Sequence, residues 1–307
     1  MNDAIIIGAG PAGCTAALWL KQLGFNPVVI DRQTTCGGLQ LSNPYSNSWI
    51  TTSPNTTGAE VAEAIHASMI EHNIRMHLGV SALNAKLERS IVSVRLSDGR
   101  LVSGKFLILA GGVTPKTGGY ASRIGMLIGP GPTLAKTKFV GEKVAILGGG
   151  DSAMETYTMV KKWGAAEVRI FARSIKARSE MVASVSPDDV VLGDCKVDAD
   201  SNLVNGERFG QILVLYGYEA SAASLLGLEL AMKPDGFVMT DEDCMTSKDG
   251  VYAIGELARR GHPCCLTSMA AGVTVAKAIQ RKIESTAITR FAGMTKRALG
   301  LGAAILK

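Results

Sequence analysis

Two glycine-rich segments of the chain have the spacing that binds nucleotide phosphates. They are GAGPAG at Gly8–Gly13 and GGGDSA at Gly148–Ala153. In such a loop the first glycine allows a tight turn, the second lets the backbone approach a pyrophosphate, and the third small residue allows close helix–strand contact. The N–H groups and the positive dipole end of the following helix then face the phosphates. One such loop is weak evidence, whereas two in one chain predict two bound nucleotides.

The residues that follow the two loops differ in charge. Asp31 lies 23 residues after Gly8, where its carboxylate can accept hydrogen bonds from a ribose diol. The matching region after the second loop has no acid and carries Arg173, Lys176 and Arg178. Cations there favour a 2′-phosphate, and therefore NADP over NAD.

Each of these motifs has a simpler explanation. The first loop could be a structural turn without a ligand, and the basic run could be a solvated loop. The strand, the spacing and the acid together favour a nucleotide at the first loop. The motif binds ADP moieties in general, so alone it does not separate FAD from NAD. The chemistry that needs two nucleotides side by side is hydride transfer between a nicotinamide and a flavin.

Hydrophobic periodicity places each loop between a buried strand and a helix. The predicted elements are strand Ala4–Ile7, helix Pro11–Leu23 and strand Asn26–Ile30 in the first unit, and strand Lys143–Leu147, helix Ser152–Trp163 and strand Glu167–Phe171 in the second. Further predictions are helix Gly58–His72, a hairpin of Ile91–Leu96 with Leu101–Val102, strands Phe106–Ala110 and Ile212–Tyr216, short strands at Asp235–Thr240 and Gly250–Ile254, and helix Cys265–Ile283.

The 307 residues, 47% of them apolar and 19% charged, suit about two globular domains. We predict an α/β protein with two Rossmann-like (FAD/NAD(P)-binding) domains, the second inserted into the first. The expected ranges are 1–113 with 245–285 for the first domain, 114–244 for the second, and 286–307 for a tail. The low aromatic content of 5% and the modest net charge of +5 argue against nucleic acid as a partner. No signal peptide or spanning segment is evident, and six cysteines without a disulfide framework indicate a reducing, cytoplasmic setting.

With these motifs the chain resembles the low-molecular-weight thioredoxin reductase family of FAD-dependent pyridine nucleotide oxidoreductases. The resemblance covers roughly residues 4–285. Besides the two loops it is carried by CGGLQL at Cys36–Leu41, LILAGG at Leu107–Gly112, DGVYAIGEL at Asp249–Leu257 and CLTSMAAG at Cys265–Gly272. The family's Gly-Asp, whose acid binds the flavin's ribityl chain, is here Gly255-Glu256.

The resemblance implies that FAD occupies the first loop, that NADPH occupies the inserted domain, and that the protein is a homodimer. The implied FAD residues are Gly8, Ala9, Gly10, Pro11, Gly13, Asp31, Arg32, Gly38, Leu39, Gln40, Ala110, Gly111, Gly255, Glu256, Cys265 and Leu266. The implied residues for NADPH or another nucleotide are Gly148, Gly149, Gly150, Asp151, Ser152, Ala153, Arg173 and Arg178.

Two departures from the family limit what the resemblance implies. The family's redox Cys-x-x-Cys lies fourteen residues before the second glycine triplet, where this chain has Gly131-Pro132-Thr133-Leu134. Thioredoxin reduction by the usual dithiol is therefore not expected. The family's His-Arg-Arg-x-x-x-Arg becomes Ala172-Arg173-Ser174-x-x-x-Arg178, with two of three guanidinium groups kept. Another nucleotide in that domain stays open.

Cys264 and Cys265 are the candidate catalytic residues if electrons leave through sulfur, with Cys36 as a third. We expect them near the flavin at a helix N-terminus, which would lower a thiol pKa; the alternative is that they are small buried packing residues. Cys14 is expected to pack in its helix. His262 could donate a proton near the flavin, and no histidine has metal-ligand spacing, so no metal site is predicted.

The tail after Ser285 carries Arg290, Lys296, Arg297 and Lys307 without an acid. It could form an amphipathic helix that covers the flavin or a dimer surface, adsorb weakly to a membrane, or be a disordered end.

We therefore predict an FAD-dependent oxidoreductase that passes electrons between NADPH and a second acceptor without the usual Cys-x-x-Cys. One alternative is a ferredoxin- or flavodoxin-NADP reductase-like enzyme with a small acidic redox protein as partner. A second is a disulfide oxidoreductase with relocated cysteines and a disulfide substrate. A third is a redox-quiet flavoprotein. No integral membrane segment is expected.

Overall fold

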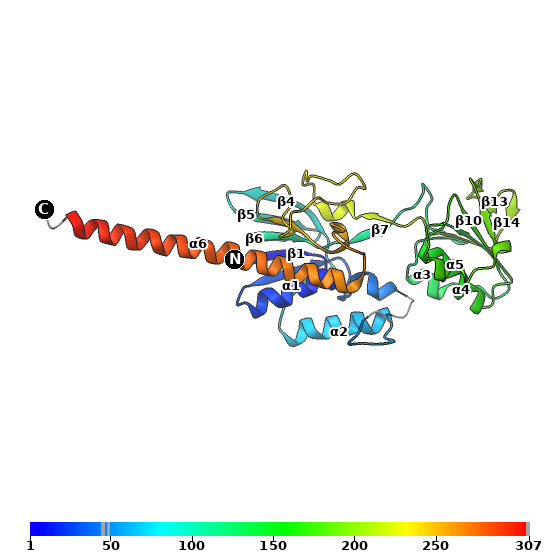
Figure 1. Ribbon diagram of the computed structural model, residues 1–307, viewed down its shortest axis with the longest axis horizontal. Coiled ribbons are helices and arrows are strands. Elements are labelled where there is room, and N and C mark those ends of the chain that lie inside the picture. The colour runs from blue at the N-terminus through cyan, green and yellow to red at the C-terminus, as the bar shows by residue number, and fades with distance from the viewer. Residues whose placement is uncertain (44–46, 48–49, 305–307) are drawn as a thin grey trace. The chain divides into compact units, whose positions relative to one another are not determined.

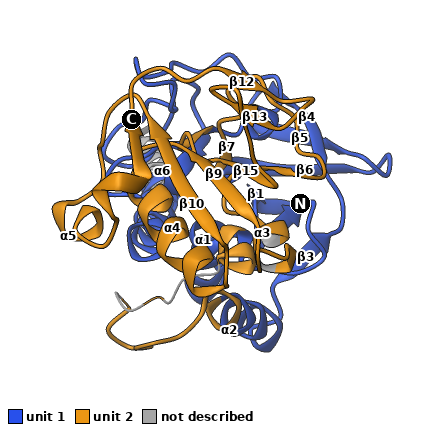
Figure 2. Cartoon of the chain, turned by 90° about the vertical axis from the view of Figure 1, so that its right-hand side faces the viewer, with its two compact units in different colours: residues 1–38, 62–112, 220–307 blue, residues 39–61, 113–219 orange. Residues whose placement is uncertain are grey.

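The chain folds into two compact units, each with its own sheet (Figure 2). This computed structural model describes residues 1–43, 47 and 50–304, with side chains except those of residues 132, 135 and 286–304. The first unit comprises residues 1–38, 62–112 and 220–307, and the second comprises residues 39–61 and 113–219. The second unit therefore interrupts the first, and the predicted α/β architecture with two Rossmann-like domains is confirmed.

The first unit is built on a seven-stranded sheet in the order β3-β2-β1-β6-β5-β4, with β17 also paired to β6. Its strands are β1 (Asn2–Ile7), β2 (Pro27–Asp31), β3 (Arg75–Leu78), β4 (Ala82–Glu88), β5 (Ile91–Leu96), β6 (Leu101–Leu109) and β17 (Val251–Ala253). Successive residues of β1 point to opposite faces of the sheet. Ala4 and Ile6 therefore enter one buried cluster, whereas Ile5 and Ile7 enter the other. Both faces are covered, which is typical of a parallel sheet.

Strand β6 joins two elements that the sequence predicts separately. Its first half pairs antiparallel with β5, as in the expected hairpin, and its second half pairs parallel with β17. Gly104 sits between the halves, where a Cβ would lie 2.9 Å from Ile5 Cγ1. The alternation of buried and exposed residues over Leu101–Lys105 gives way to a wholly buried run from Phe106. Because the periodicity changes within β6, the sequence pattern predicts two separate strands where the structure has one.

Helices α1 (Pro11–Gln22) and α6 (Cys265–Ala304) pack side by side on one face of this sheet (Figure 1). Gly272 makes the contact close, because a Cβ there would lie 2.6 Å from Ala12 O and 2.8 Å from Ala16 N. Helix α6 does not end at Ile283, as the sequence suggested, but continues to Ala304. The roles expected for the basic tail depend on its side chains. These side chains, and residues 305–307, lie outside the described part of the chain.

Residues 220–244 belong to the first unit, although the sequence placed them in the inserted domain. Asp235–Thr240 forms no strand and contributes only the bridge between Met232 and Val238. Val238 and Leu226 are buried in the same cluster as Leu107 of the first sheet. This packing moves the return to the first unit from residue 245 to Ala220, and the division near residue 113 falls at 112/113 rather than 113/114. Residues 39–61, which the sequence predicts in the first domain, group with the second unit.

The second unit has a parallel five-stranded sheet in the order β11-β10-β9-β15-β8. Its strands are β8 (Met126–Ile128), β9 (Lys143–Leu147), β10 (Glu167–Ala172), β11 (Val190–Leu192) and β15 (Gln211–Val214). The helices are α3 (Pro132–Lys136), α4 (Asp151–Lys162) and α5 (Ser179–Val182). A small sheet joins β12 (Val197–Asp198), β13 (Leu203–Val204) and β14 (Glu207–Arg208), and β7 (Val113–Pro115) pairs with β16 (Tyr218–Ala220). The remaining elements are α2 (Gly58–Glu71) and the 3-10 helices η1 (Gly38–Ser42), η2 (Pro187–Asp189), η3 (Ala222–Leu225) and η4 (Gly255–Leu257).

Replacing Gly272 with alanine should lower the stability of the first unit, because the added methyl group would collide with the backbone of α1. Overpacking of this kind typically costs about 1–3 kcal/mol. The denaturant midpoint of unfolding measures the loss. Gly131→Ala is the control, since a Cβ at Gly131 meets nothing within 4 Å and its φ of −102° suits alanine. Equal midpoints for Gly272→Ala and the wild type would contradict the close helix contact.

Candidate functional site

Two glycines of the first loop are required by the protein's own packing. Gly8 has a φ of +113°, and a Cβ there would lie 2.3 Å from Ala110 O. A Cβ at Gly13 would lie 2.0 Å from Gly8 O. Neither position can hold a side chain without moving the backbone. These contacts fix the turn between β1 and α1 and bring Ala110, at the end of β6, next to the loop.

Gly10 differs from these two glycines because nothing in the protein requires it. It is the N-cap of α1, with extended φ and ψ of −76° and −178° that alanine readily adopts. The nearest atom to a Cβ there would be Gly38 Cα at 3.8 Å, an ordinary contact. The absence of a side chain at Gly10 therefore leaves open space at the helix N-terminus, where Pro11 begins α1. A phosphate-containing ligand is what such a site accommodates.

The Asp31 carboxylate holds the first loop in place. Its Oδ2 accepts a hydrogen bond from Ala9 N at 2.6 Å, and its Oδ1 accepts one from Gln33 N at 2.7 Å. The Ala9 carbonyl in turn accepts the N–H of Gly37 at 2.8 Å. Each carboxylate oxygen keeps a second acceptor position, so the group can still bind a ribose hydroxyl. The neighbouring Arg32 is exposed.

The second loop repeats these contacts in the second unit. Gly148 has a φ of +144°, and a Cβ there would lie 2.3 Å from Leu215 O. Gly150 is the N-cap of α4, and a Cβ there would meet nothing within 4 Å. The Gly149 carbonyl accepts the N–H groups of Lys176 at 2.7 Å and Ala177 at 3.1 Å. The two fingerprints therefore share one backbone arrangement, with an open position at Gly10 and at Gly150.

The charged residues of the second loop are partly engaged with each other. Arg178 Nε donates to Asp151 Oδ2 at 2.9 Å, and its backbone N–H donates to Asp151 Oδ1 at 2.9 Å. Arg173 lies exposed after the end of β10. Ser152 follows Asp151 in the first turn of α4, and Ala153 is buried beneath it. The sequence pattern predicted cations here, but it could not show that Arg178 already has a carboxylate partner.

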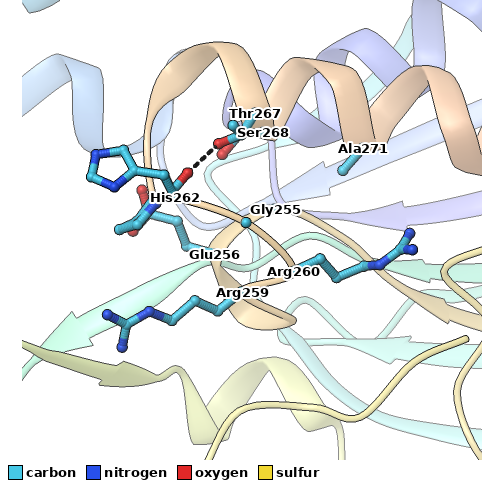
Figure 3. A pocket seen from close by; sticks show the side chains of 10 residues that line it. Gly255, Glu256, Arg259, Arg260, His262, Thr267, Ser268 and Ala271 are labelled. Atoms are coloured by element: carbon cyan, nitrogen blue, oxygen red, sulfur yellow. Dashed lines mark hydrogen bonds between the residues drawn. The ribbon is translucent and has the colours of Figure 1, made fainter. Parts of the chain in front are cut away.

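A pocket at the start of α6 lies beside the first loop. A Cβ at Gly255 would be 2.9 Å from the Ala12 Cβ, so this end of the pocket borders the first turn of α1. Burial raises the pKa of the Glu256 carboxyl, while the positive charge of Arg259 opposes the shift. Arg259 and Arg260 extend in opposite directions from the same loop (Figure 3). The lining residues are Gly255, Glu256, Arg259, Arg260, Gly261, His262, Pro263, Thr267, Ser268 and Ala271.

The two arginines of this pocket contact the protein rather than one another. The guanidinium carbon of Arg259 (Cζ) lies 5.0 Å from the centroid of the Phe237 ring. Arg260 Nη1 donates to Glu242 O at 2.9 Å and to Cys244 Sγ at 3.0 Å. The His262 side chain is exposed, and its carbonyl accepts the Thr267 hydroxyl at 2.6 Å (Figure 3).

Cys264 and Cys265 differ from the expectation of reactive thiols at a helix N-terminus. Burial raises the pKa of Cys265 to about 11, so the predicted lowering is wrong for this residue. Desolvation of the charged form outweighs the helix dipole here. Cys264 Sγ accepts the Thr267 N–H at 3.4 Å and so satisfies a free donor of the first turn of α6. Cys264 therefore behaves as a residue that starts a helix, and Cys265 behaves as a buried packing residue.

The remaining implied FAD residues fall into two groups. Gly38 and Gly111 lie near the first loop: Gly38 approaches Gly10, and a Cβ at Gly8 would lie 3.0 Å from Gly111 N. Leu39 and Gln40 lie in η1 and group with the second unit, and Leu266 is exposed on the first turn of α6. Cys36 lies behind the first loop and does not line the pocket.

The sequence does not predict that His66 and Cys14 lie close to Cys36, because the spacing of the three residues forms no motif. In the described part of the chain, no three His, Cys, Asp or Glu side chains gather as a metal site. No described helix is long and apolar enough to cross a membrane.

Comparisons with known proteins agree with this geometry. Residues 129–286 match the model of the pyridine nucleotide-disulphide oxidoreductase family, and residues 6–65 match an NAD(P)-binding Rossmann-like domain. The chain is 27% identical over 288 residues to a ferredoxin–NADP reductase of Ignicoccus hospitalis, covering 84% of this chain and 90% of that protein. It is 26% identical over 327 residues to a thioredoxin reductase of Peptoclostridium acidaminophilum, covering 92% and 97%. The crystal structure of Lactococcus lactis thioredoxin reductase shares the fold, with a TM-score of 0.78, 19% identity, and coverage of 92% of this chain and 98% of that one.

Gly10→Ala should leave the fold intact and weaken binding of an ADP-containing nucleotide at the first loop. The new methyl group fits the protein but occupies the space where a pyrophosphate would lie. We expect an affinity loss of at least ~10-fold, equivalent to about 1.4 kcal/mol. FAD titration monitored by flavin fluorescence measures it, alongside the thermal midpoint of the apoprotein. Gly13→Ala is the matched variant that should lower both, and unchanged affinity in Gly10→Ala would place the ligand elsewhere.

Cys265 should resist alkylation at pH 8 and become reactive only as the pH approaches 11. With a pKa of about 11, only about one thiol in a thousand is thiolate at pH 8. Timed iodoacetamide labelling followed by peptide mass spectrometry compares Cys265 with its half-buried neighbour Cys264. Rapid labelling of Cys265 at pH 8 would contradict the effect of burial.

Proposed function

Since the chain belongs to the pyridine nucleotide-disulphide oxidoreductase family, we propose that it is an FAD-dependent reductase that moves electrons from NADPH to a small redox protein. The observation that carries the proposal is the pair of glycine loops, each with one position, Gly10 or Gly150, left open by the protein. Two such positions suit two nucleotides. Bound FAD would supply a flavin that accepts hydride from a nicotinamide and passes electrons onward.

The first unit offers sites for both ends of an extended cofactor. The N–H groups at the start of α1 would bind the pyrophosphate, and Asp31 would accept a hydrogen bond from the ribose. The pocket that begins at Gly255, which lies beside Ala12 of α1, extends to the start of α6. There Glu256 would bind polar groups of the chain that links the flavin ring to the pyrophosphate. The positive dipole end of the long helix α6 favours negative charge on a ring bound before it.

The second unit would bind NADPH. Its loop has the same open N-cap glycine, and Arg173 and Lys176 are exposed after the strand where an acid would otherwise select NAD. Arg178 would orient the loop through Asp151 and share its guanidinium with a phosphate. If this pairing keeps Arg178 from the ligand, a different nucleotide would occupy the unit.

The cysteines favour a carrier protein over a disulfide as the electron acceptor. No two cysteines of the sequence have the Cys-x-x-Cys spacing. Cys265 is held protonated by burial, and Cys264 is engaged with Thr267. The net charge of +5 suits a small acidic ferredoxin- or flavodoxin-type partner. The six unpaired cysteines fit a reducing compartment such as the cytoplasm, and the family resemblance favours a homodimer.

Anaerobic titration of the FAD-loaded protein with NADPH should bleach the flavin absorbance stoichiometrically. NADH should do so more slowly, because the cations after β10 would lack a 2′-phosphate to bind. Addition of an oxidised ferredoxin or flavodoxin should then restore the flavin colour.

The control is Cys264→Ser, which should reduce the carrier at the wild-type rate. If this variant loses turnover while still bleaching with NADPH, the disulfide alternative replaces the carrier proposal. A protein that stays fully oxidised at every NADPH concentration would refute the proposed reductase activity.

A further inference from the structure

Two buried cysteines lie together directly behind the first loop. Cys14 comes from the end of the first turn of α1, and Cys36 comes from the loop after β2; both belong to one buried cluster. The Cys14 thiol donates to Ala9 O at 3.2 Å, and the same carbonyl accepts the N–H of Gly37, the residue after Cys36, at 2.8 Å. The two cysteines therefore lie on either side of one backbone carbonyl, although 22 residues separate them in the sequence. Neither residue takes part in the electron transfer proposed above.

The surroundings make the two thiols unequal. The hydrogen bond from Cys14 lowers the pKa of Cys36 to about 6, and the His66 imidazole adds to this effect, whereas burial and the Asp31 carboxylate oppose it. His66 Nδ1 also accepts the Cys36 N–H at 3.3 Å, which fixes the ring beside the cysteine. The interaction with Cys36 and burial raise the pKa of Cys14. Cys36 is the nucleophile of the pair and Cys14 is its protonated partner.

The position of the pair connects it to the nucleotide loop. The carbonyl of Ala9 faces the Cys14 thiol and accepts the N–H of Gly37. One residue further on, Gly38 packs against Gly10, since a Cβ at Gly38 would lie 2.9 Å from Gly10 Cα. A covalent bond between Cys14 and Cys36 would tie the 32–38 loop to α1 at the edge of the phosphate site.

We propose that Cys14 and Cys36 are a reversible thiol–disulfide pair, oxidised by peroxide, whose disulfide locks the 32–38 loop and slows exchange of the nucleotide at the first loop. The effect on exchange rests on the proposed FAD site, whereas the disulfide itself does not. The disulfide forms when the two sulfur atoms approach to about 2.05 Å.

The chemistry uses only the two thiols and hydrogen peroxide. The Cys36 thiolate attacks one peroxide oxygen, the O–O bond breaks, hydroxide leaves, and Cys36 becomes a sulfenic acid. Cys14 then attacks this sulfur, the S–S bond forms, and the sulfenic oxygen leaves as water with the Cys14 proton. Two thiols lose two electrons in total, and one peroxide becomes two molecules of water. A small thiol reverses the bond by exchange.

Access to Cys36 requires opening of the loop that covers it. The cysteine is fully buried, but Arg32, Gln33 and Thr34 just before it are exposed. Local opening of such a surface loop costs far less than unfolding. Oxidation should therefore proceed in the folded protein, at a rate below that of an exposed thiol.

Peroxide treatment of the FAD-loaded protein, followed by alkylation and non-reducing peptide mass spectrometry, tests the pair. We expect a peptide that links Cys14 to Cys36 and disappears with dithiothreitol. FAD release, followed by fluorescence after dilution, should be about tenfold slower in the oxidised protein. The stabilisation that one disulfide typically contributes is large enough for a change of this size.

Cys195→Ser, which removes a cysteine of the second unit, is the control and should behave as the wild type. Cys14→Ser and Cys36→Ser should lose both the linked peptide and the slower release.

The proposed pair would be overturned if Cys14 and Cys36 were alkylated separately after peroxide, or if Cys36 were overoxidised without forming a disulfide. A linked peptide with unchanged FAD release would overturn the locking effect. A protein that binds no FAD would refute the proposed function instead, and the linked peptide would still decide whether the pair forms.

Discussion

The hydrogen bond from the Ala9 N–H to the Asp31 carboxylate is the interaction on which the geometry of the first loop depends. It is charge-assisted and short, so it fixes the loop after β1 against the end of β2. The carbonyl of Ala9 accepts the N–H of Gly37 and so fixes the following loop as well. One residue thereby holds three segments together. These hydrogen bonds hold the neighbouring segments without covering Gly10, so the N-terminus of α1 stays open to a ligand.

The second unit keeps this backbone arrangement and changes the side chains. Gly149 takes the place of Ala9, and its carbonyl binds the N–H groups of Lys176 and Ala177. No acid follows the strand, and the charge there is positive. Because the shared backbone provides phosphate binding, the side chains around it are left to select between nucleotides. The two loops therefore share a backbone geometry and differ in the charge around it, which suits the proposed hydride transfer between two different nucleotides.

The local features of these sites could be predicted from the sequence, and the features that depend on packing could not. The tight packing at Gly8 and Gly13 follows from the spacing within one strand–turn–helix unit. The pKa of Cys265 was mispredicted because burial by distant residues outweighs the helix terminus that the sequence displays. The division at Ala220 was missed because residues 220–244 have little regular structure, and only their packing assigns them. The Cys14–Cys36 contact has no sequence signal, since it arises where α1 and the loop after β2 meet.

The central claim is that the first unit holds FAD and the second holds a different, exchangeable nucleotide. The most direct measurement is the identity and number of nucleotides released when the purified protein is denatured, determined by chromatography and mass spectrometry. The account predicts one FAD per chain, with NADP(H) recovered only when it is added before isolation. Two FAD per chain, or a protein that stays free of flavin after incubation with FAD, would contradict it.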